Sequence, residues 1–130
     1  MGIKADLRPK APRDYDGFAL SNEPELFRLG WIANYPSPDA ILPPLFGTDS
    51  LDNLTGYSNP AVDAMLRAAR AESNPDRRAQ LYHDIERTVM EQLPVVPIAQ
   101  FNVHSVIAKR AKGLRLNSYG SFDATQVRVG

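Results

Sequence analysis

Residues 59–92 read NPAVDAMLRAARAESNPDRRAQLYHDIERTVMEQ, and this stretch decides the fold. Asn59 and Asn74 are each followed by proline, the arrangement of an N-cap asparagine before proline at the first helical position. We therefore predict helices over residues 60–71 and 75–92. Each helix has one apolar face at helical spacing. These faces are formed by Val62, Met65, Leu66 and Ala69 in the first helix and by Leu81, Tyr82, Ile85 and Val89 in the second.

Shorter segments on both sides of this helix pair carry strand and turn signals. Apolar alternation or β-branched content predicts strands at residues 2–7, 25–31, 94–101, 102–108 and 113–116. A short helix is expected at 14–20, a helical turn at 39–42, a polar loop at 47–58, a basic turn at 109–112, and irregular structure in the last dozen residues. This alternation favours an α/β fold in which a mixed sheet is flanked by the two amphipathic helices.

The composition excludes several classes of protein. Length allows one domain with a core, and the hydrophobic share of 43% with 23% charged residues is typical of a globular protein. Fifteen Lys and Arg balance fifteen Asp and Glu, so no basic stripe favours nucleic acid. The absence of cysteine excludes disulfides and thiolate sites. No apolar run approaches the ~20 residues that span a bilayer, and residues 1–6 lack the apolar region of a secretory signal.

A second informative segment is GWIANYPSPD, residues 30–39, where a Gly-Trp pair ends the strand predicted at 25–31 and a proline-rich loop follows. Eleven prolines in this chain lie mainly between the apolar segments, which implies long ordered connections. Such connections are often where ligands are bound. The segment has the character of part of a ligand cleft and carries no catalytic motif.

Five pieces of the sequence, taken in order, resemble the extracellular solute-binding proteins of family 5, the oligopeptide, dipeptide and nickel receptors of ABC importers. These pieces are GIK at 2–4, LGW with YPSPD within 29–39, YSNPAVD at 57–63, RxxLYxxIE with LPVVPI within 78–98, and GLRLN at 113–117. Each piece alone is a weak signal, but five in the family's order are specific.

The resemblance implies a type II periplasmic-binding-protein fold, in which two α/β lobes close on a ligand like a hinge. Family members are much longer, so residues 1–130 would form a single domain or fragment. It would correspond to the later part of the second lobe, with the C-terminal strands returning toward the first. The implied partners are a small-molecule or peptide ligand, the membrane subunits of an ABC importer and the missing lobe. The implied location is extracytoplasmic, and no cofactor is implied.

Asn34 departs from the family pattern. Many peptide-binding relatives have aspartate at this position, and its carboxylate pairs with the free α-amino group of the ligand. An asparagine oxygen still accepts a hydrogen bond but supplies no negative charge. We therefore expect weaker selection for a free peptide N-terminus, and a ligand that is a modified peptide, a sugar or another polar solute.

The neighbouring residues complete the predicted ligand-binding set. Trp31 is expected to stack on the ligand, although a core tryptophan at a strand end is the plainer interpretation. Arg28 would bind an anionic ligand group or form an internal salt bridge. Backbone groups are expected to bind an extended ligand at Gly30, Ile32 and Ala33. Tyr35 and Tyr57 are more often packing residues, with the hydroxyl at the surface, than ligand contacts.

Alternative functions have less support in the sequence. Acid pairs such as Asp14 with Asp16, or Asp49 with Asp52, are interpreted as turn residues that bond their own backbone. His83 and His104 lie far apart, so no metal site is predicted. There is no nucleophile elbow, phosphate loop or dinucleotide motif. We expect a binding protein, not an enzyme. The runner-up is a family-derived interaction or regulatory module without a transport function.

Overall fold

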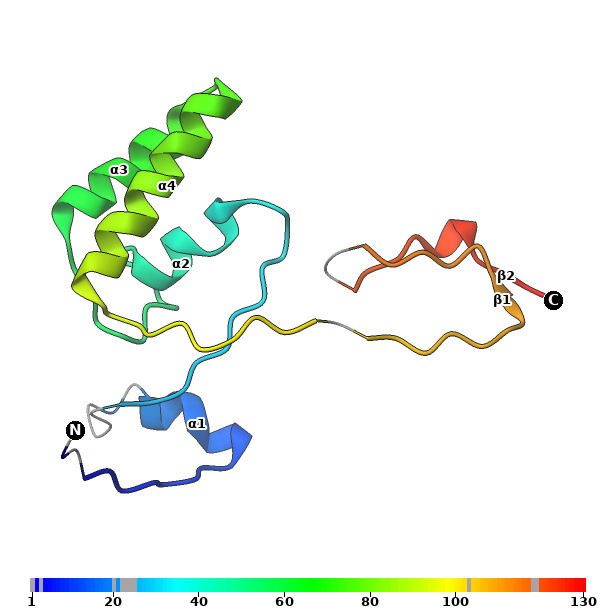
Figure 1. Cartoon of the computed structure of the whole chain (residues 1–130), viewed down its shortest axis with the longest axis horizontal. Coiled ribbons are helices and arrows are strands. Elements are labelled where there is room, and N and C mark those ends of the chain that lie inside the picture. Colours follow the sequence, from blue (N-terminus) through cyan, green and yellow to red (C-terminus); the bar gives the residue numbers. More distant parts are fainter. Residues whose placement is uncertain (1, 3, 20, 22–25, 103, 118–119) are drawn as a thin grey trace. The chain divides into compact units, whose positions relative to one another are not determined.

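The computed structural model describes residues 2, 4–19, 21, 26–102, 104–117 and 120–130. The chain divides into two compact units, Met1–Gly30 and Trp31–Gly130, and each is described here by itself. Figure 1 shows the elements in chain colours. The described residues form four α-helices, two short 3-10 helices and one two-stranded sheet.

Helices α3 (Pro60–Ala71) and α4 (Pro75–Gln92) form an antiparallel pair, with the bounds that the sequence predicts. The side chain of Asn59 caps α3 by accepting hydrogen bonds from two backbone N–H groups, and Asn74 caps α4 in the same way. None of the described helices combines the length and the apolar character needed to cross a bilayer.

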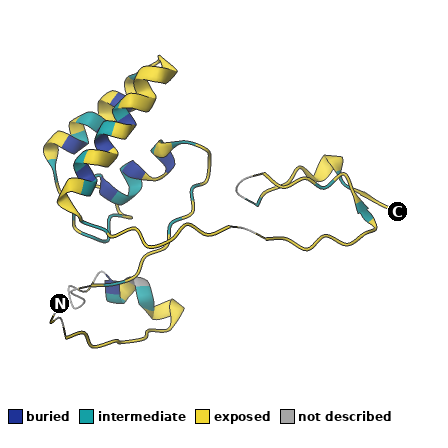
Figure 2. Ribbon diagram, in the orientation of Figure 1, coloured by how far each residue is buried: buried dark blue, intermediate teal, exposed yellow. Residues whose placement is uncertain are grey.

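A small core lies between this pair and the short helix α2 (Leu42–Phe46). Ile85, Val62 and Val89 are its largest fully buried side chains. Figure 2 shows the dark blue residues collected on the facing sides of these helices. The whole cluster consists of Leu42, Phe46, Val62, Leu66, Ala69, Tyr82, Ile85 and Val89. The predicted apolar faces are therefore the buried ones, although Met65 and Leu81 are only partly buried.

The loop at 47–58 is polar, as predicted, and is held against α3 by side-chain hydrogen bonds. The backbone N–H of Thr48 donates to Asp63 over 3.0 Å, and its hydroxyl donates to the same carboxylate over 2.7 Å. The Asn53 amide donates to the carbonyls of Gly47 and Tyr57. These bonds hold both ends of the loop beside the start of α3.

Asn74 carries the first stability prediction. Its side-chain oxygen accepts from the backbone N–H groups of Asp76 and Arg77, each over 3.0 Å. Asn74→Ala leaves these groups without a protein partner and should lower the free energy of unfolding by about 1 kcal/mol. Ser73→Ala, one residue earlier and exposed, is the matched control and should change it by less than about 0.5 kcal/mol. Urea unfolding followed by circular dichroism measures both, and equal losses would contradict the capping role.

The mixed sheet expected from the sequence is absent from the described residues. Four of the five predicted strands do not form: no residue is in a strand at 2, 4–7, 26–31, 94–102 or 104–108. Residues 3, 25 and 103 of these predicted strands lie outside the described residues. A strand needs a neighbour to complete its backbone hydrogen bonds, and these segments have none. Several of their apolar side chains are exposed, with Leu26 89% and Ile98 87% exposed, although Val95 is partly buried against the core. The apolar pattern identifies segments whose composition suits a sheet, but it does not show whether another segment lies beside them to pair with.

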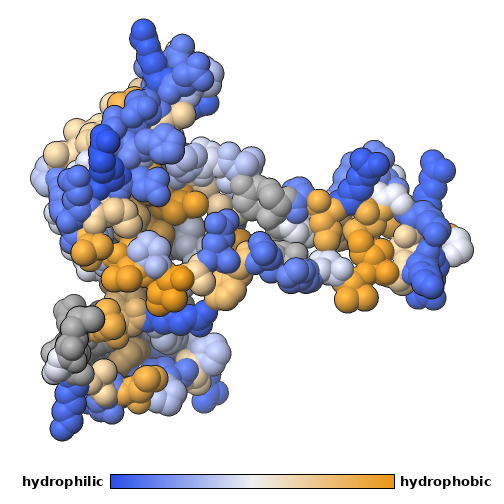
Figure 3. Space-filling view, in the orientation of Figure 1, coloured by the Kyte–Doolittle hydropathy of each residue, from blue (hydrophilic) through white to orange (hydrophobic). Residues whose placement is uncertain are grey.

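The sheet that does form is a C-terminal hairpin. Strand β1 (Ala111–Lys112) pairs antiparallel with β2 (Arg128–Val129), and an isolated bridge joins Leu116 to Phe122. The strand expected at 113–116 is thus reduced to one bridge, and the irregular tail contains both β2 and the 3-10 helix η2 (Ala124–Gln126). Gly113 has φ +77°, and a Cβ there would lie 2.2 Å from a backbone oxygen of η2, so the turn after β1 requires glycine. Figure 3 shows apolar atoms on the surface of this hairpin.

The described residues of the first unit contain one helix, α1 (Pro12–Ala19), where the sequence predicts a helix at 14–20; residue 20 lies outside the described residues. Proline at its first position suits a helix start. The Tyr15 hydroxyl donates to the backbone carbonyl of Arg28, which joins the helix to the end of this unit. The ammonium group of Lys10 lies 4.4 Å from the centre of the Phe18 ring.

Candidate ligand-binding site

Residues 31–40 form a loop closed by two side-chain hydrogen bonds, and we call it the 31–40 loop. The indole N–H of Trp31 donates to the carbonyl of Ala40 over 2.7 Å. The hydroxyl of Tyr35 donates to Asp39 over 2.9 Å. The second half of the loop is the 3-10 helix η1 (Pro38–Ala40), which is capped by the Ser37 side chain. Both bonds return the chain onto η1, so the predicted ligand segment begins and ends at fixed points.

Asp39 connects this loop to the helix pair. One of its carboxylate oxygens accepts from Tyr35, and the other accepts from Arg70 Nε and from the Tyr82 hydroxyl, each over 3.0 Å. Arg70 belongs to α3 and Tyr82 to α4. The Asp39 side chain is 22% exposed, so these bonds are only partly open to water. One carboxylate therefore joins the loop to both long helices.

The charge state of Asp39 suits this role. Partial burial raises its pKa, but hydrogen bonds from Arg70, Tyr35 and Tyr82 outweigh burial, and the pKa is lower than its ordinary value. Burial, together with the hydrogen bond to Asp39, raises the pKa of Tyr82 to about 12. The hydrogen bond to Asp39 likewise raises the pKa of Tyr35. At neutral pH the cluster consists of a carboxylate, a guanidinium and two neutral phenols.

Between its two fixed points the 31–40 loop presents Ile32, Ala33 and Asn34. Ile32 is 80% exposed, and the Asn34 side chain is also exposed. Within the part of the chain that the structure describes, the backbone N–H and C=O groups of Ile32 and Ala33 make no hydrogen bond. Backbone groups in this state can pair with an extended ligand. Trp31 is half-buried and Tyr35 is 46% exposed, so both rings keep some open surface.

Arg28 and Gly30 lie in the first unit, directly before this loop in the sequence. The Arg28 side chain is exposed and makes no ion pair with any described residue. A Cβ built on Gly30 would meet nothing within 4 Å, so its surroundings are open. The seven predicted residues therefore fall in two groups, Trp31 to Tyr35 in the loop of the second unit and these two before it.

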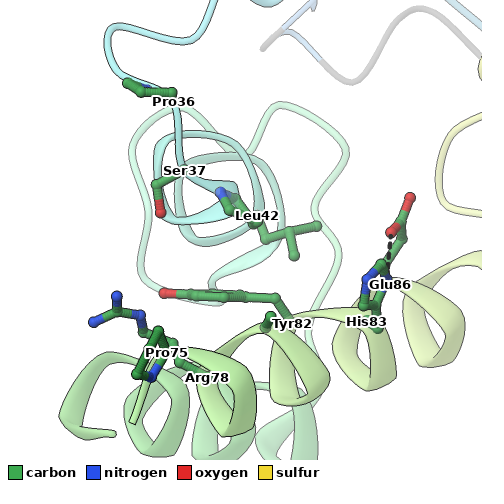
Figure 4. A pocket seen from close by; sticks show the side chains of 10 residues that line it. Pro36, Ser37, Leu42, Pro75, Arg78, Tyr82, His83 and Glu86 are labelled. Carbon is green, nitrogen blue, oxygen red and sulfur yellow. Dashed lines mark ion pairs between the residues drawn. The ribbon is translucent and has the colours of Figure 1, made fainter. Parts of the chain in front are cut away.

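A pocket of about 270 Å³ opens between the 31–40 loop and α4. Figure 4 shows the Tyr82 ring lying between Ser37 of the loop and the helix. Arg78 stands on one side of this ring, and the ion pair of His83 with Glu86 stands on the other. The remaining lining residues are Pro36, Pro38, Leu42, Pro75 and Ala79. None of the seven predicted residues lines the pocket, but the loop that carries five of them forms one of its walls.

Sequence reasoning missed the cluster that supports the loop. Asp39 was noted only as part of the family pattern, although its position four residues after Tyr35 could have suggested a contact between them. No sequence feature marks Arg70 as part of a cluster, because exposed arginines on helices are common. Tyr82 is correctly predicted on the buried face, but its hydroxyl partner lies 43 residues earlier in the chain.

The other polar groups considered in the sequence do not assemble into a site. No group of three or more metal-binding side chains occurs among the described residues. Among the described residues, the carboxylates of Asp49 and Asp52 accept no backbone hydrogen bond, so that detail of their interpretation is wrong. The hydroxyl of Ser50 accepts the backbone N–H of Asp52 and forms the turn instead. Tyr57 packs edge-on against Phe46 at 6.0 Å, with its hydroxyl buried and not at the surface as expected.

Comparison with known proteins finds relatives that match most of this chain. A dipeptide-binding protein of Pseudomonas aeruginosa is 29% identical to this chain over 121 residues, which are 92% of the chain and 23% of that relative. The peptide transport periplasmic protein SapA of Haemophilus influenzae is 30% identical over 128 residues, which are 94% of the chain and 22% of the relative. The chain is a homologue of periplasmic peptide-binding proteins. This confirms the resemblance to family 5.

The homology also has a clear extent. A heme-binding protein of Haemophilus influenzae is 29% identical over 126 residues, 95% of the chain and 23% of its own length. The present chain thus spans less than a quarter of the length of each of these three relatives. No family model matches the chain. Because relatives of similar identity carry the names of different ligands, the identity of the ligand does not follow from the homology.

Proposed function

We propose that this chain is part of the substrate-binding component of an ABC importer and forms one wall of its ligand cleft. The captured solute is peptide-like or another polar molecule, and capture occurs by lobe closure without covalent chemistry. The observation that carries this proposal is the 31–40 loop, whose ends are fixed while its middle presents unpaired backbone groups. The names of the relatives support the solute class.

The geometry of the loop suits reversible binding. A segment that is already ordered loses little conformational entropy when a ligand arrives, so more of the contact energy appears as affinity. The bonds of Trp31 to Ala40 and of Tyr35 to Asp39 provide this order. The backbone groups of Ile32 and Ala33 make no hydrogen bond to any described residue, as addition of an extended ligand requires.

We propose an individual role for each of the predicted residues. Trp31 provides an aromatic surface, and its N–H stays bonded to the loop. Asn34 binds a polar ligand group through its exposed amide. Arg28 binds an anionic group, Gly30 allows close approach of a ligand to the backbone, and Tyr35 closes the end of the segment.

The rest of the binding protein would supply the opposite wall. The exposed apolar segments support this part of the proposal, because Ile98 and Phe101 are 87% and 77% exposed and pair with no strand among the described residues. Partners are then the missing lobe, the importer's membrane subunits and the solute, in an extracytoplasmic location. This location is supported by the periplasmic relatives.

The second candidate is an interaction module without a transport function, which the same exposed apolar segments favour. Native mass spectrometry of the purified protein, first without ligand and then with a mixture of di- and tripeptides, separates the two functions. The proposal predicts a bound mass of a few hundred daltons in at least one of these spectra. A dimer that takes up no peptide favours the interaction module, and a monomer that takes up none contradicts solute binding by this chain.

A further inference from the structure

We propose that Asp39 is a positioning residue for ligand binding, which holds the 31–40 loop in its binding shape by joining Tyr35 to helices α3 and α4. This inference rests on the proposed function, because it concerns the same loop. Asp39 itself does not contact the ligand in this account. It acts through Tyr35, the last residue of the predicted ligand segment.

The bonding pattern supports a positioning role more than a general stabilising one. A carboxylate that stabilised only the helix pair would need just the bonds from Arg70 and Tyr82. Here the second oxygen is used for Tyr35, which is 46% exposed and contributes little to the core. A single rigid side chain therefore relates the loop to two helices.

The rest of the loop depends on this connection. Trp31 is bonded to the carbonyl of Ala40, the residue directly after Asp39. A shift of Asp39 moves both closing bonds of the loop together. Residues 32–34 have no backbone hydrogen bond of their own within the described structure, so their position follows from that of the two closing bonds. Loss of the Asp39 carboxylate should consequently make residues 32–34 less well fixed in position.

The test compares three variants of the complete chain at a temperature where all of them are folded. Asp39→Ala removes every bond of the cluster. Asp39→Asn keeps one oxygen that can accept from a tyrosine hydroxyl. Asn74→Ala is the control, because it destabilises α4 without touching the loop. Affinity for dialanine is measured by calorimetry, and access to Trp31, the chain's single tryptophan, by acrylamide quenching of its fluorescence.

Asp39→Ala should weaken dialanine binding by about 10-fold, which corresponds to about 1.4 kcal/mol, and should increase quenching of Trp31. For Asp39→Asn, both the dialanine affinity and the quenching of Trp31 should lie between those of Asp39→Ala and those of the unchanged protein. For Asn74→Ala, both should equal those of the unchanged protein. Equal affinity and quenching in Asp39→Ala and the unchanged protein would overturn the proposal, as would equal losses in Asp39→Ala and Asn74→Ala. If even the unchanged protein binds no dialanine, the solute-binding function fails for this ligand, and quenching alone still decides whether Asp39 holds the loop.

Discussion

Replacing Ile85 with alanine is expected to lower the free energy of unfolding by about 2–5 kcal/mol, the largest stability effect in this chain. Ile85 is fully buried at the centre of the cluster that joins α2, α3 and α4. Alanine loses the transfer free energy of three carbon atoms and leaves a cavity that rigid helices fill only in part. The cluster has eight buried residues, and a domain is typically stable by only about 5–15 kcal/mol, so this loss is a large share.

Ile98→Ala is the matched control for this prediction. It removes the same atoms from a side chain that is 87% exposed, and it should change the free energy of unfolding by less than about 0.5 kcal/mol. Urea unfolding followed by circular dichroism measures both variants. Equal destabilisation by the two substitutions would show that Ile98 is buried in solution, contrary to its exposure in the structure.

The second large effect is expected from Asn34→Asp. We expect a carboxylate at this exposed position of the 31–40 loop to pair with the free α-amino group of a peptide, as the resemblance to family 5 implies. A hydrogen bond to a charged group contributes about 1.5–3 kcal/mol, so affinity for dialanine should rise by about 10- to 100-fold. Affinity for N-acetyl-dialanine, which has no ammonium group, should not rise.

Asn102→Asp is the control for the added charge. Asn102 is also exposed, but it lies outside the loop, so its change should leave both affinities within about twofold of the unchanged protein. Calorimetric titration of the two peptides measures all four values. If Asn34→Asp leaves dialanine affinity unchanged while the peptide still binds, residue 34 does not face the ligand's amino group.

Local signals predicted the helices well because helix formation is largely a local matter. Asn59 and Asn74 cap the helices they precede, and the apolar face of α4 around Ile85 is the buried one. The expected strands differ in kind, because a strand requires hydrogen bonds to a distant segment. Residues 94–101 have the composition of a strand but pair with no other described segment, whereas the hairpin forms where β1 and β2 can reach each other.

In the candidate site, too, local features could be predicted from the sequence and contacts between distant residues could not. The sequence pattern and the resemblance to family 5 predict a ligand segment from Trp31 to Tyr35; it lies in a loop closed by two hydrogen bonds, and its ligand role stays a prediction. The cluster that holds this loop was not predicted, because its members come from three elements: Arg70 and Tyr82 lie 31 and 43 residues from Asp39 in the sequence. No pattern in one sequence reports which of several exposed charges will meet in space.

The most direct test of the account uses the fluorescence of Trp31, since no other tryptophan contributes to the signal. The purified protein is titrated with dialanine, and binding is measured in parallel by calorimetry. The account predicts a saturable change in Trp31 emission whose midpoint agrees with the calorimetric affinity, because the ligand binds against the 31–40 loop. Binding detected by calorimetry without any change in Trp31 emission, or no binding by either method, would contradict it.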